Sequence, residues 1–163
     1  MAAINTQQKV SKAQRWTITS DKFLTQEQVL QLISHLTNER DLAIARGINR
    51  QAIRDYYPIR GLLETGLRVF EFCDLQTADL QGQRLTVRRG KGGKARTVLL
   101  TRTTQNLFKE WLVVRNKFSF SELPQASLFP SRYQQPYTTR GIQCRVKKVF
   151  RHLGLPAHFS VHS

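Results

Sequence analysis

Apolar residues recur with helical spacing shortly after the start of the chain. Thr25 and Gln28 have the spacing of a capping box, in which the two side chains close the first turn of a helix. The apolar residues that follow at helical intervals are Val29, Leu32, Ile33 and Leu36. We therefore expect order to begin at Phe23 and an amphipathic helix to follow. Residues 1–22 are polar and basic without a sustained period, which predicts a flexible arm or linker remnant.

A second helical region is predicted over residues 41–65. Gly66 is well placed to end it, because glycine readily adopts the left-handed conformation found after helices. Pro58 lies inside the region and predicts a kink or a break between two helices. The apolar face after the proline consists of Ile59, Leu62, Leu63 and Leu67. A short helix is expected next, over residues 69–74.

The period changes in the middle of the chain. Leu85 and Val87 alternate with polar residues, and residues 97–100 form a β-favouring run. Between them lies Gly-Lys-Gly-Gly-Lys at residues 90–94, a composition typical of a loop. This pattern predicts a β-hairpin.

Two more helices are expected in the second half. One starts near Thr103 or Thr104 and has an apolar face of Leu107, Trp111, Val114 and Phe118. Residues 119–137 hold three of the five prolines and predict a loop. The last helix begins after Thr138 and ends at Gly154, and it buries Ile142, Val146, Val149, Phe150 and Leu153. The predicted fold class is α+β, mainly helical with a small antiparallel sheet in the middle.

The charge of the chain is large and unevenly placed. The net charge is +15, and residues 84–163 hold 16 Lys and Arg against only 2 Asp and Glu. A one-sided excess of this size favours a polyanionic partner, because each cation that neutralises a phosphate also releases counterions. Nucleic acid is the favoured partner, although an anionic membrane or an acidic protein would be attracted by the same charge.

Several other function classes are disfavoured. No stretch approaches the roughly 18 uncharged apolar residues of a membrane span, and the N-terminus lacks the apolar core of a secretory signal. Cys73 and Cys144 form no Cys-x-x-Cys pair, so the expected location is a reducing cytoplasm. Gly93-Lys94 is followed by Ala95 and a strand, which does not fit a nucleotide-binding P-loop. His158 and His162 are four residues apart, but no glutamate or third ligand accompanies them to make a metal site.

The segment around Arg68 carries the most specific chemistry. Arg68 follows a glycine break and lies within an apolar run, so its side chain is expected to be partly buried. Burying a charge is costly, so a partner or a function is expected for it. Glu71 is one helical turn further on and can hold the guanidinium while leaving donors free for a phosphate. The alternative is an ordinary surface ion pair, worth well under ~1 kcal/mol.

The order of the motifs resembles the catalytic domain of the tyrosine recombinase, or phage integrase, family. The chain opens with Phe23-Leu24-Thr25-Gln26-Glu27, continues with Thr-Gly-Leu-Arg-x-x-Glu at residues 65–71 and then has the Gly-Lys-Gly-x-Lys hairpin. Leu-Phe-Pro-Ser, a basic helix that ends in Gly-Leu-Pro and His-x-x-x-His-Ser follow in the family's order. The resemblance covers residues 23–163, which we expect to form part of one catalytic domain.

The resemblance implies a mechanism for cutting and rejoining DNA through a 3′-phosphotyrosyl intermediate. Arg68 matches the arginine that grips the scissile phosphate, and Glu71 matches the acidic residue that supports the site. Lys91 matches the hairpin lysine that protonates the departing 5′ oxygen, with Lys94 as the alternative. His162 matches the first residue of the family's His-x-x-Arg motif. Family members use neither a metal nor a nucleoside triphosphate, so no cofactor is expected.

The family pattern also continues beyond what this sequence contains. The second arginine and the nucleophilic tyrosine would follow Ser163, and the four tyrosines of the chain all precede His162. The chain is therefore expected to be inactive in strand cleavage by itself. It is interpreted as a fragment of a recombinase, or alternatively as a truncated, non-catalytic relative that binds DNA or inhibits an intact partner. A generic RNA-binding or ribosomal protein would explain the charge, but not Arg68 within an apolar run.

Duplex DNA is the expected partner, and self-association is expected as well. The candidate DNA contacts are Arg88, Arg89, Lys94, Arg140, Arg145, Lys147, Lys148 and Arg151, although a basic helix can also be a simple solvated face. If the interpretation is correct, Arg68, Glu71 and Lys91 must converge in space.

Overall fold

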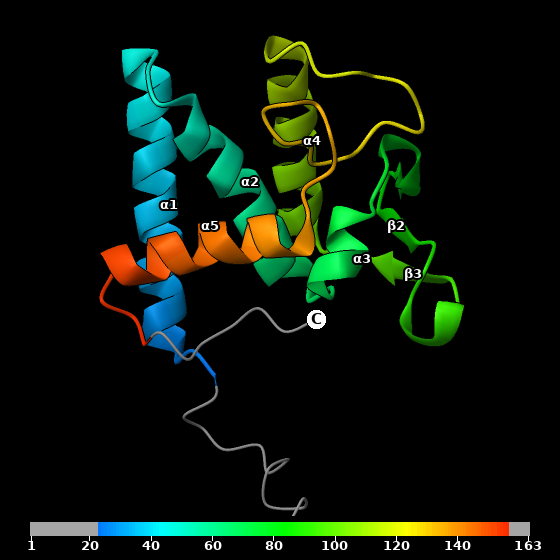
Figure 1. Cartoon of the computed structure of the whole chain (residues 1–163), viewed down its shortest axis with the longest axis horizontal. Coiled ribbons are helices and arrows are strands. Elements are labelled where there is room, and N and C mark those ends of the chain that lie inside the picture. The colour runs from blue at the N-terminus through cyan, green and yellow to red at the C-terminus, as the bar shows by residue number, and fades with distance from the viewer. Residues whose placement is uncertain (1–22, 157–163) are drawn as a thin grey trace, which may run out of the picture.

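The computed structural model describes residues 23–156 and contains five α-helices and three strands (Figure 1). The helices are α1 (Gln26–Arg46), α2 (Arg50–Thr65), α3 (Val69–Cys73), α4 (Arg102–Lys117) and α5 (Thr139–His152). The strands are β1 (Leu80–Gln81), β2 (Arg84–Val87) and β3 (Arg96–Leu99), and short 3-10 turns lie at η3 (Thr77–Asp79) and η4 (Lys91–Gly93). The predicted α+β class is confirmed. The arm assigned to residues 1–22 lies outside the described residues.

The first helix begins as its sequence predicts. Thr25 caps α1 by accepting a hydrogen bond from the Gln28 backbone N–H at 3.2 Å, and the Gln28 side chain accepts one from the Thr25 N–H at 2.9 Å. The helix continues past Asp41 to Arg46 and ends at Gly47, whose φ of 64° is left-handed. A glycine meets no steric penalty there, so the chain can reverse direction at this point.

Of the two alternatives predicted at Pro58, a kink or a break, the break is wrong. The two helices are separated at residues 47–49, and α2 runs through Pro58 to Thr65. Pro58 removes one backbone donor from the helix, but it is buried in the core, where packing compensates for that loss. Gly66, with a φ of 60°, ends the helix as expected.

The hairpin belongs to a three-stranded antiparallel sheet in the order β1-β2-β3. Leu85 pairs with Val98 and Val87 with Arg96, and both apolar residues of β2 are buried. The alternation in the sequence therefore identified the inward face correctly. The strand β1 was not predicted, because two residues are too short to show a period.

The core joins α4 to the long loop that was expected at residues 119–137. Trp111 stacks on Phe129 with ring centroids 5.6 Å apart, and its indole N–H donates to the Leu128 carbonyl at 2.7 Å. Phe72 of α3 also stacks on Phe129, with centroids 4.5 Å apart. This aromatic stack fixes α3, and with it the residues on either side of that short helix.

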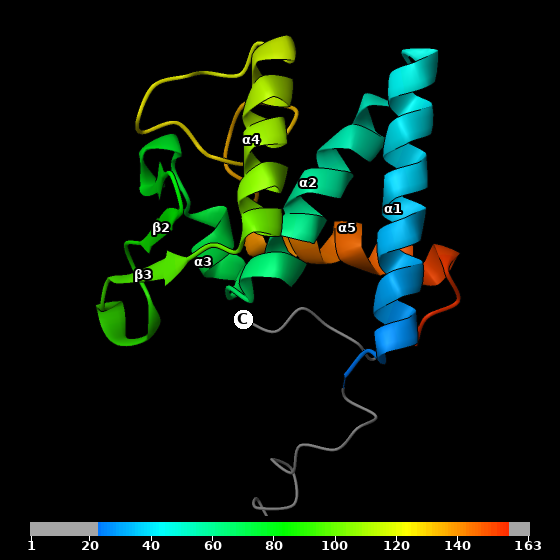
Figure 2. The same cartoon turned by 180° about the vertical axis from the view of Figure 1, so that it is seen from behind.

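Helix α5 crosses the lower part of α1 and α2, and α3 lies between α5 and the sheet (Figures 1 and 2). The turn at η4 is at the same lower end, whereas the end of α1, the start of α2 and the end of α4 point the opposite way (Figures 1 and 2). The fold thus brings α3, α5 and the 90–94 loop to one end of the molecule.

Candidate functional site

Arg68 is the last residue of the three-residue turn between α2 and α3. Its neighbours Leu67 and Val69 are buried, but its extended backbone (φ −63°, ψ 145°) lets the guanidinium reach the surface. The side chain is 43 % exposed, which is partial burial, as the sequence indicated. The guanidinium can therefore meet a ligand from solvent.

Glu71 is the buried acceptor at this position. Its side chain is 0 % exposed and accepts a hydrogen bond from the Arg68 backbone N–H at 3.1 Å. The Arg68 guanidinium lies 3.6 Å from the Glu71 carboxylate, within ion-pair distance but beyond a good hydrogen bond. The predicted proximity of Arg68 and Glu71 is thus present, with the backbone rather than the side chain making the closer contact.

A second arginine that the sequence analysis did not single out makes the strongest contacts to Glu71. Arg96 on β3 binds the carboxylate with both terminal nitrogens, at 2.7 Å and 2.8 Å. These hydrogen bonds, with smaller contributions from Arg68, hold the pKa of Glu71 below its usual range despite burial. The sequence signal was weak: Arg96 was one more arginine in a basic hairpin, 25 residues from its partner.

The 90–94 loop begins beside this carboxylate. The Gly90 N–H donates to the Lys94 carbonyl at 2.9 Å, and the Gly93 N–H donates to the Gly90 carbonyl at 3.0 Å, which closes the loop. A methyl group at Gly90 would lie 2.8 Å from Arg96 Nη1 and 3.6 Å from Glu71 Oε1. The base of the loop therefore packs directly on the pair formed by Glu71 and Arg96.

Of the predicted convergence of Arg68, Glu71 and Lys91, the structure describes the proximity of Arg68 and Glu71, and the place of the Lys91 side chain stays a prediction. The backbone of Lys91 follows Gly90 at the base of the loop, while its side chain and the whole of His162 lie outside the described residues. Lys94, the alternative lysine, is exposed at the end of the loop. The choice between the two lysines stays open.

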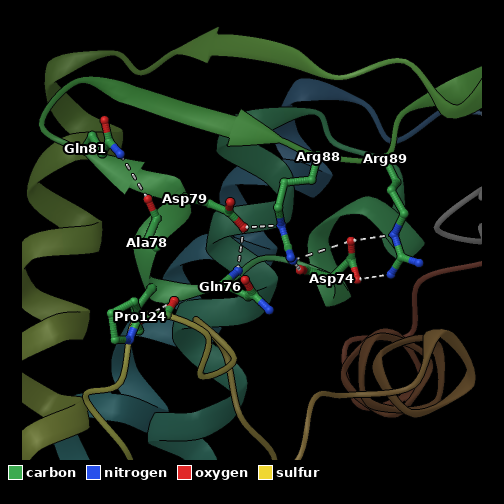
Figure 3. Close-up of polar contacts among 9 residues, drawn as sticks. Asp74, Gln76, Ala78, Asp79, Gln81, Arg88, Arg89 and Pro124 are labelled. Carbon is green, nitrogen blue, oxygen red and sulfur yellow. Dashed lines mark hydrogen bonds and ion pairs between the residues drawn. The ribbon is translucent and has the colours of Figure 1, made fainter.

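Arg88 and Arg89 are held by acidic residues of the same domain (Figure 3). Arg88 Nε donates to Asp79 at 3.0 Å, and its terminal nitrogen donates to the Asp74 carbonyl. Arg89 Nη2 donates to Asp74 at 2.5 Å, although its side chain is 74 % exposed. Both candidate DNA contacts thus have protein partners, and of the two Arg89 is the better placed to reach a ligand.

Helix α5 divides its basic residues into two groups. Arg145 is directed at Asp55 of α2 and forms an ion pair there. The other four candidates are exposed and make no hydrogen bond or ion pair within residues 23–156; they are Arg140, Lys147, Lys148 and Arg151. These four are available to a phosphate backbone, whereas Arg145 primarily joins α5 to the body.

Other chemistries find little support in the part of the chain that the structure describes. Among residues 23–156, no three His, Cys, Asp or Glu side chains are grouped in a way that could hold a metal ion. His35 and His152 stack with centroids 4.8 Å apart, on a groove that Lys148 also lines. None of the described helices is long and apolar enough to cross a membrane.

Comparisons with known proteins identify the family of this chain. Residues 22–163 match the model of the phage integrase family. The tyrosine recombinase XerC of Caldanaerobacter subterraneus is 33 % identical over 110 residues, which are 67 % of this chain and 30 % of that protein. The tyrosine recombinase XerA of Pyrococcus furiosus is 35 % identical over 96 residues, which are 58 % of this chain and 29 % of that protein.

A similar fold is found in the structure of the Tn1549 transposon integrase in complex with circular intermediate DNA. The TM-score is 0.66 at 18 % identity, and the match covers 89 % of this chain and 50 % of that one. The chain spans about a third of the length of the curated relatives that it matches. On the family match over residues 22–163, the chain belongs to the phage integrase family of tyrosine recombinases.

Proposed function

We propose that this chain is the DNA-binding first part of a tyrosine recombinase catalytic domain, with Arg68 as the phosphate-binding residue. The observation that carries the proposal is the position of Arg68: an exposed guanidinium beside a buried carboxylate, at the end of the molecule that also holds α5 and the 90–94 loop. The integrase of similar fold was solved with DNA, and duplex DNA is the partner proposed here.

In this proposal, Arg68 binds the non-bridging oxygens of the scissile phosphate and stabilises the negative charge of the pentavalent transition state. A preorganised cation is effective there, because it needs no reorganisation as the charge develops. Glu71 accepts a hydrogen bond from the Arg68 backbone N–H and is too buried to contact the phosphate itself. It orients Arg68 without repelling the substrate at close range.

The family match supports the remaining roles that we propose. A lysine of the 90–94 loop, Lys91 or alternatively Lys94, donates the proton that the departing 5′ oxygen needs. His162 assists at the phosphate, and a tyrosine of the whole recombinase supplies the nucleophile that forms the 3′-phosphotyrosyl bond. No metal or nucleotide takes part.

We also propose contacts to the DNA phosphates that flank the reacting one. Exposed cations of α5, with Arg89 and Lys94, contact phosphates on either side of the reacting one. We further propose that residues 23–163 are one partial domain and that it self-associates on DNA. It acts in the cytoplasm of its host, or at the nucleoid.

Duplex binding by the purified chain tests the proposal. We expect non-specific binding that weakens steeply as salt rises, because phosphate contacts dominate it. Arg68→Ala should weaken binding more than Arg46→Ala, which removes the same charge from the last turn of α1, at the opposite end of the molecule. Equal losses in the two variants, or affinity that does not change with salt, would contradict the assignment of Arg68.

A further inference from the structure

Arg96 contacts two parts of the candidate site at once. On one side its guanidinium binds both oxygens of Glu71, at 2.7 Å and 2.8 Å. On the other side it packs against the backbone of Gly90, where an added methyl carbon would come within 2.8 Å of Nη1. Arg96 therefore lies between the carboxylate that holds Arg68 and the first residue of the lysine-bearing loop.

The geometry of Glu71 gives Arg96 control over Arg68. Glu71 is fully buried, so the hydrogen bonds from Arg96 and from the Arg68 backbone fix its orientation. Two parallel N–H donors of a planar guanidinium fix the orientation of the whole carboxylate plane. An ammonium group, which acts as a point charge, cannot do this. If the two hydrogen bonds from Arg96 are lost, the Glu71 carboxylate can rotate. The oxygen that accepts from the Arg68 backbone N–H then moves as well.

The Lys94 carbonyl, together with the Arg96 guanidinium, explains why residue 90 is a glycine. The backbone of Gly90 has φ −86° and ψ −168°, a conformation that any residue can adopt. The requirement is one of space, because a side chain there would collide with the Lys94 carbonyl at 2.7 Å and with Arg96. The loop thus closes against Arg96 without an intervening side chain.

We propose that Arg96 is a positioning residue that sets the place of Arg68 relative to the 90–94 loop. It acts through Glu71 on one side and through the backbone contact at Gly90 on the other, and it does not bind the scissile phosphate. This inference rests on the proposed function, since it takes Arg68 as the phosphate-binding group and the loop as the source of the lysine.

The first test is a double-mutant cycle on the affinity for duplex DNA. Arg96→Lys keeps the charge but loses the two-point grip on Glu71, and should weaken binding by about fivefold. The same change in an Arg68→Ala background should have almost no effect, because the group that it positions is gone. Arg46→Lys is the matched control and should leave affinity unchanged. An equal loss with and without Arg68, or no loss at all, would overturn the proposal.

The second test needs no DNA. We would record the backbone amide resonance of Arg68 and the carboxyl titration of Glu71 by NMR in the parent, in Arg96→Lys and in Gly90→Ala. The alanine crowds both the Arg96 guanidinium and the Lys94 carbonyl without removing a charge, and it serves if the lysine variant folds poorly. Both variants should shift the Arg68 amide and raise the pKa of Glu71.

An unchanged Arg68 amide in both variants would refute the positioning role, whatever the DNA result. If instead the parent chain binds no duplex DNA while the amide shifts as expected, the proposed function fails and the structural coupling stands. The two failures are thus distinguishable.

Discussion

Arg145 of α5 and Asp55 of α2 form an ion pair across 90 residues of sequence, with Arg145 Nε donating to Asp55 Oδ1 at 2.7 Å. The second nitrogen of the guanidinium binds the other carboxylate oxygen, so the contact is bidentate. Hydrogen bonding to Asp55 raises the pKa of Arg145 above its ordinary value. The pair fixes α5 on the body and thereby orients the exposed cations of the same helix.

The first prediction concerns this pair. Asp55→Asn should lower the free energy of unfolding by about 1–2 kcal/mol, because it leaves a half-buried guanidinium without its charged partner. Arg145 is 27 % exposed and Asp55 12 % exposed, so solvent replaces the lost contact only in part. Urea unfolding measures the change. Lys147→Ala on the exposed face is the control and should stay within roughly 0.5 kcal/mol of the parent.

The exposed face of α5 should be visible in the salt dependence of DNA binding. Lys147→Ala removes one cation without a partner in the described part of the chain, and should reduce the magnitude of the slope of log affinity against log salt by about 0.9. Asp55→Asn should not lower it, since no cation is lost. A slope that Lys147→Ala leaves intact would show that α5 faces away from the duplex.

The sequence predicted most of the elements because their burial is periodic. Leu32 and Leu36, or Leu85 and Val87, repeat at the spacing of the secondary structure that buries them. The break at Pro58 was misplaced for a related reason: a buried proline can be retained inside a helix by tertiary packing, which no local pattern reports.

The candidate site was predictable only in part. Arg68 and Glu71 are neighbours in sequence, so one helical turn brings them together. Arg96 reaches Glu71 because the predicted hairpin packs beside α3 (Figure 1), and the alternation of residues in the hairpin does not specify that packing. Likewise, nothing in the basic run of α5 distinguishes Arg145, whose partner lies on another helix, from Lys147 and Lys148 beside it.

A buried arginine should hold the 119–137 loop in place. Arg115 of α4 donates to the carbonyls of Ser127 and Leu128 at 2.6 Å and to that of Ser121 at 2.6 Å. Desolvation lowers its pKa, and its charge is balanced by these carbonyl dipoles. Arg115→Ala should cost about 3 kcal/mol in unfolding free energy, because several buried carbonyls lose their donor.

Amide hydrogen exchange can show whether Arg115→Ala loosens the 119–137 loop. The Leu128 amide, which donates to the Leu75 carbonyl at 2.8 Å, should exchange faster in Arg115→Ala. The exposed neighbour Lys117→Ala is the control and should leave it unchanged. Unchanged protection in Arg115→Ala would mean that the aromatic stack alone holds the loop.

Glu71 should make stability depend on acid pH. Its pKa is lower in the folded chain than in the unfolded one, mainly through Arg96, so folding favours the charged carboxylate. The resulting stabilisation is complete above the pKa of an unfolded glutamate and disappears as pH falls through the folded value. Glu71→Gln should therefore be less stable than the parent at neutral pH. That difference should narrow in urea unfolding below about pH 4, and a constant difference would exclude the carboxylate as its cause.

The last prediction concerns the tyrosines that this chain contains. We expect no covalent protein–DNA adduct, because the family's nucleophilic tyrosine follows the His-x-x-Arg motif, whereas all four tyrosines here precede His162. Tyr56 and Tyr57 are buried in α2, and burial raises the pKa of Tyr57 to about 12. Burial also raises the pKa of Tyr137. Tyr133 is 68 % exposed, but it lies in the 119–137 loop with the Arg132 guanidinium 4.5 Å from its ring.

A nicked duplex of randomised sequence is a suitable trap, since its cleaved fragment diffuses away and leaves any phosphotyrosyl bond in place. Denaturing gel electrophoresis should show free DNA only, alongside a complete recombinase that gives the adduct on its own nicked site. Single phenylalanine substitutions at the four tyrosines provide the decisive comparison. An adduct that one of them abolishes would identify a nucleophile within this chain and would require a different arrangement around Arg68.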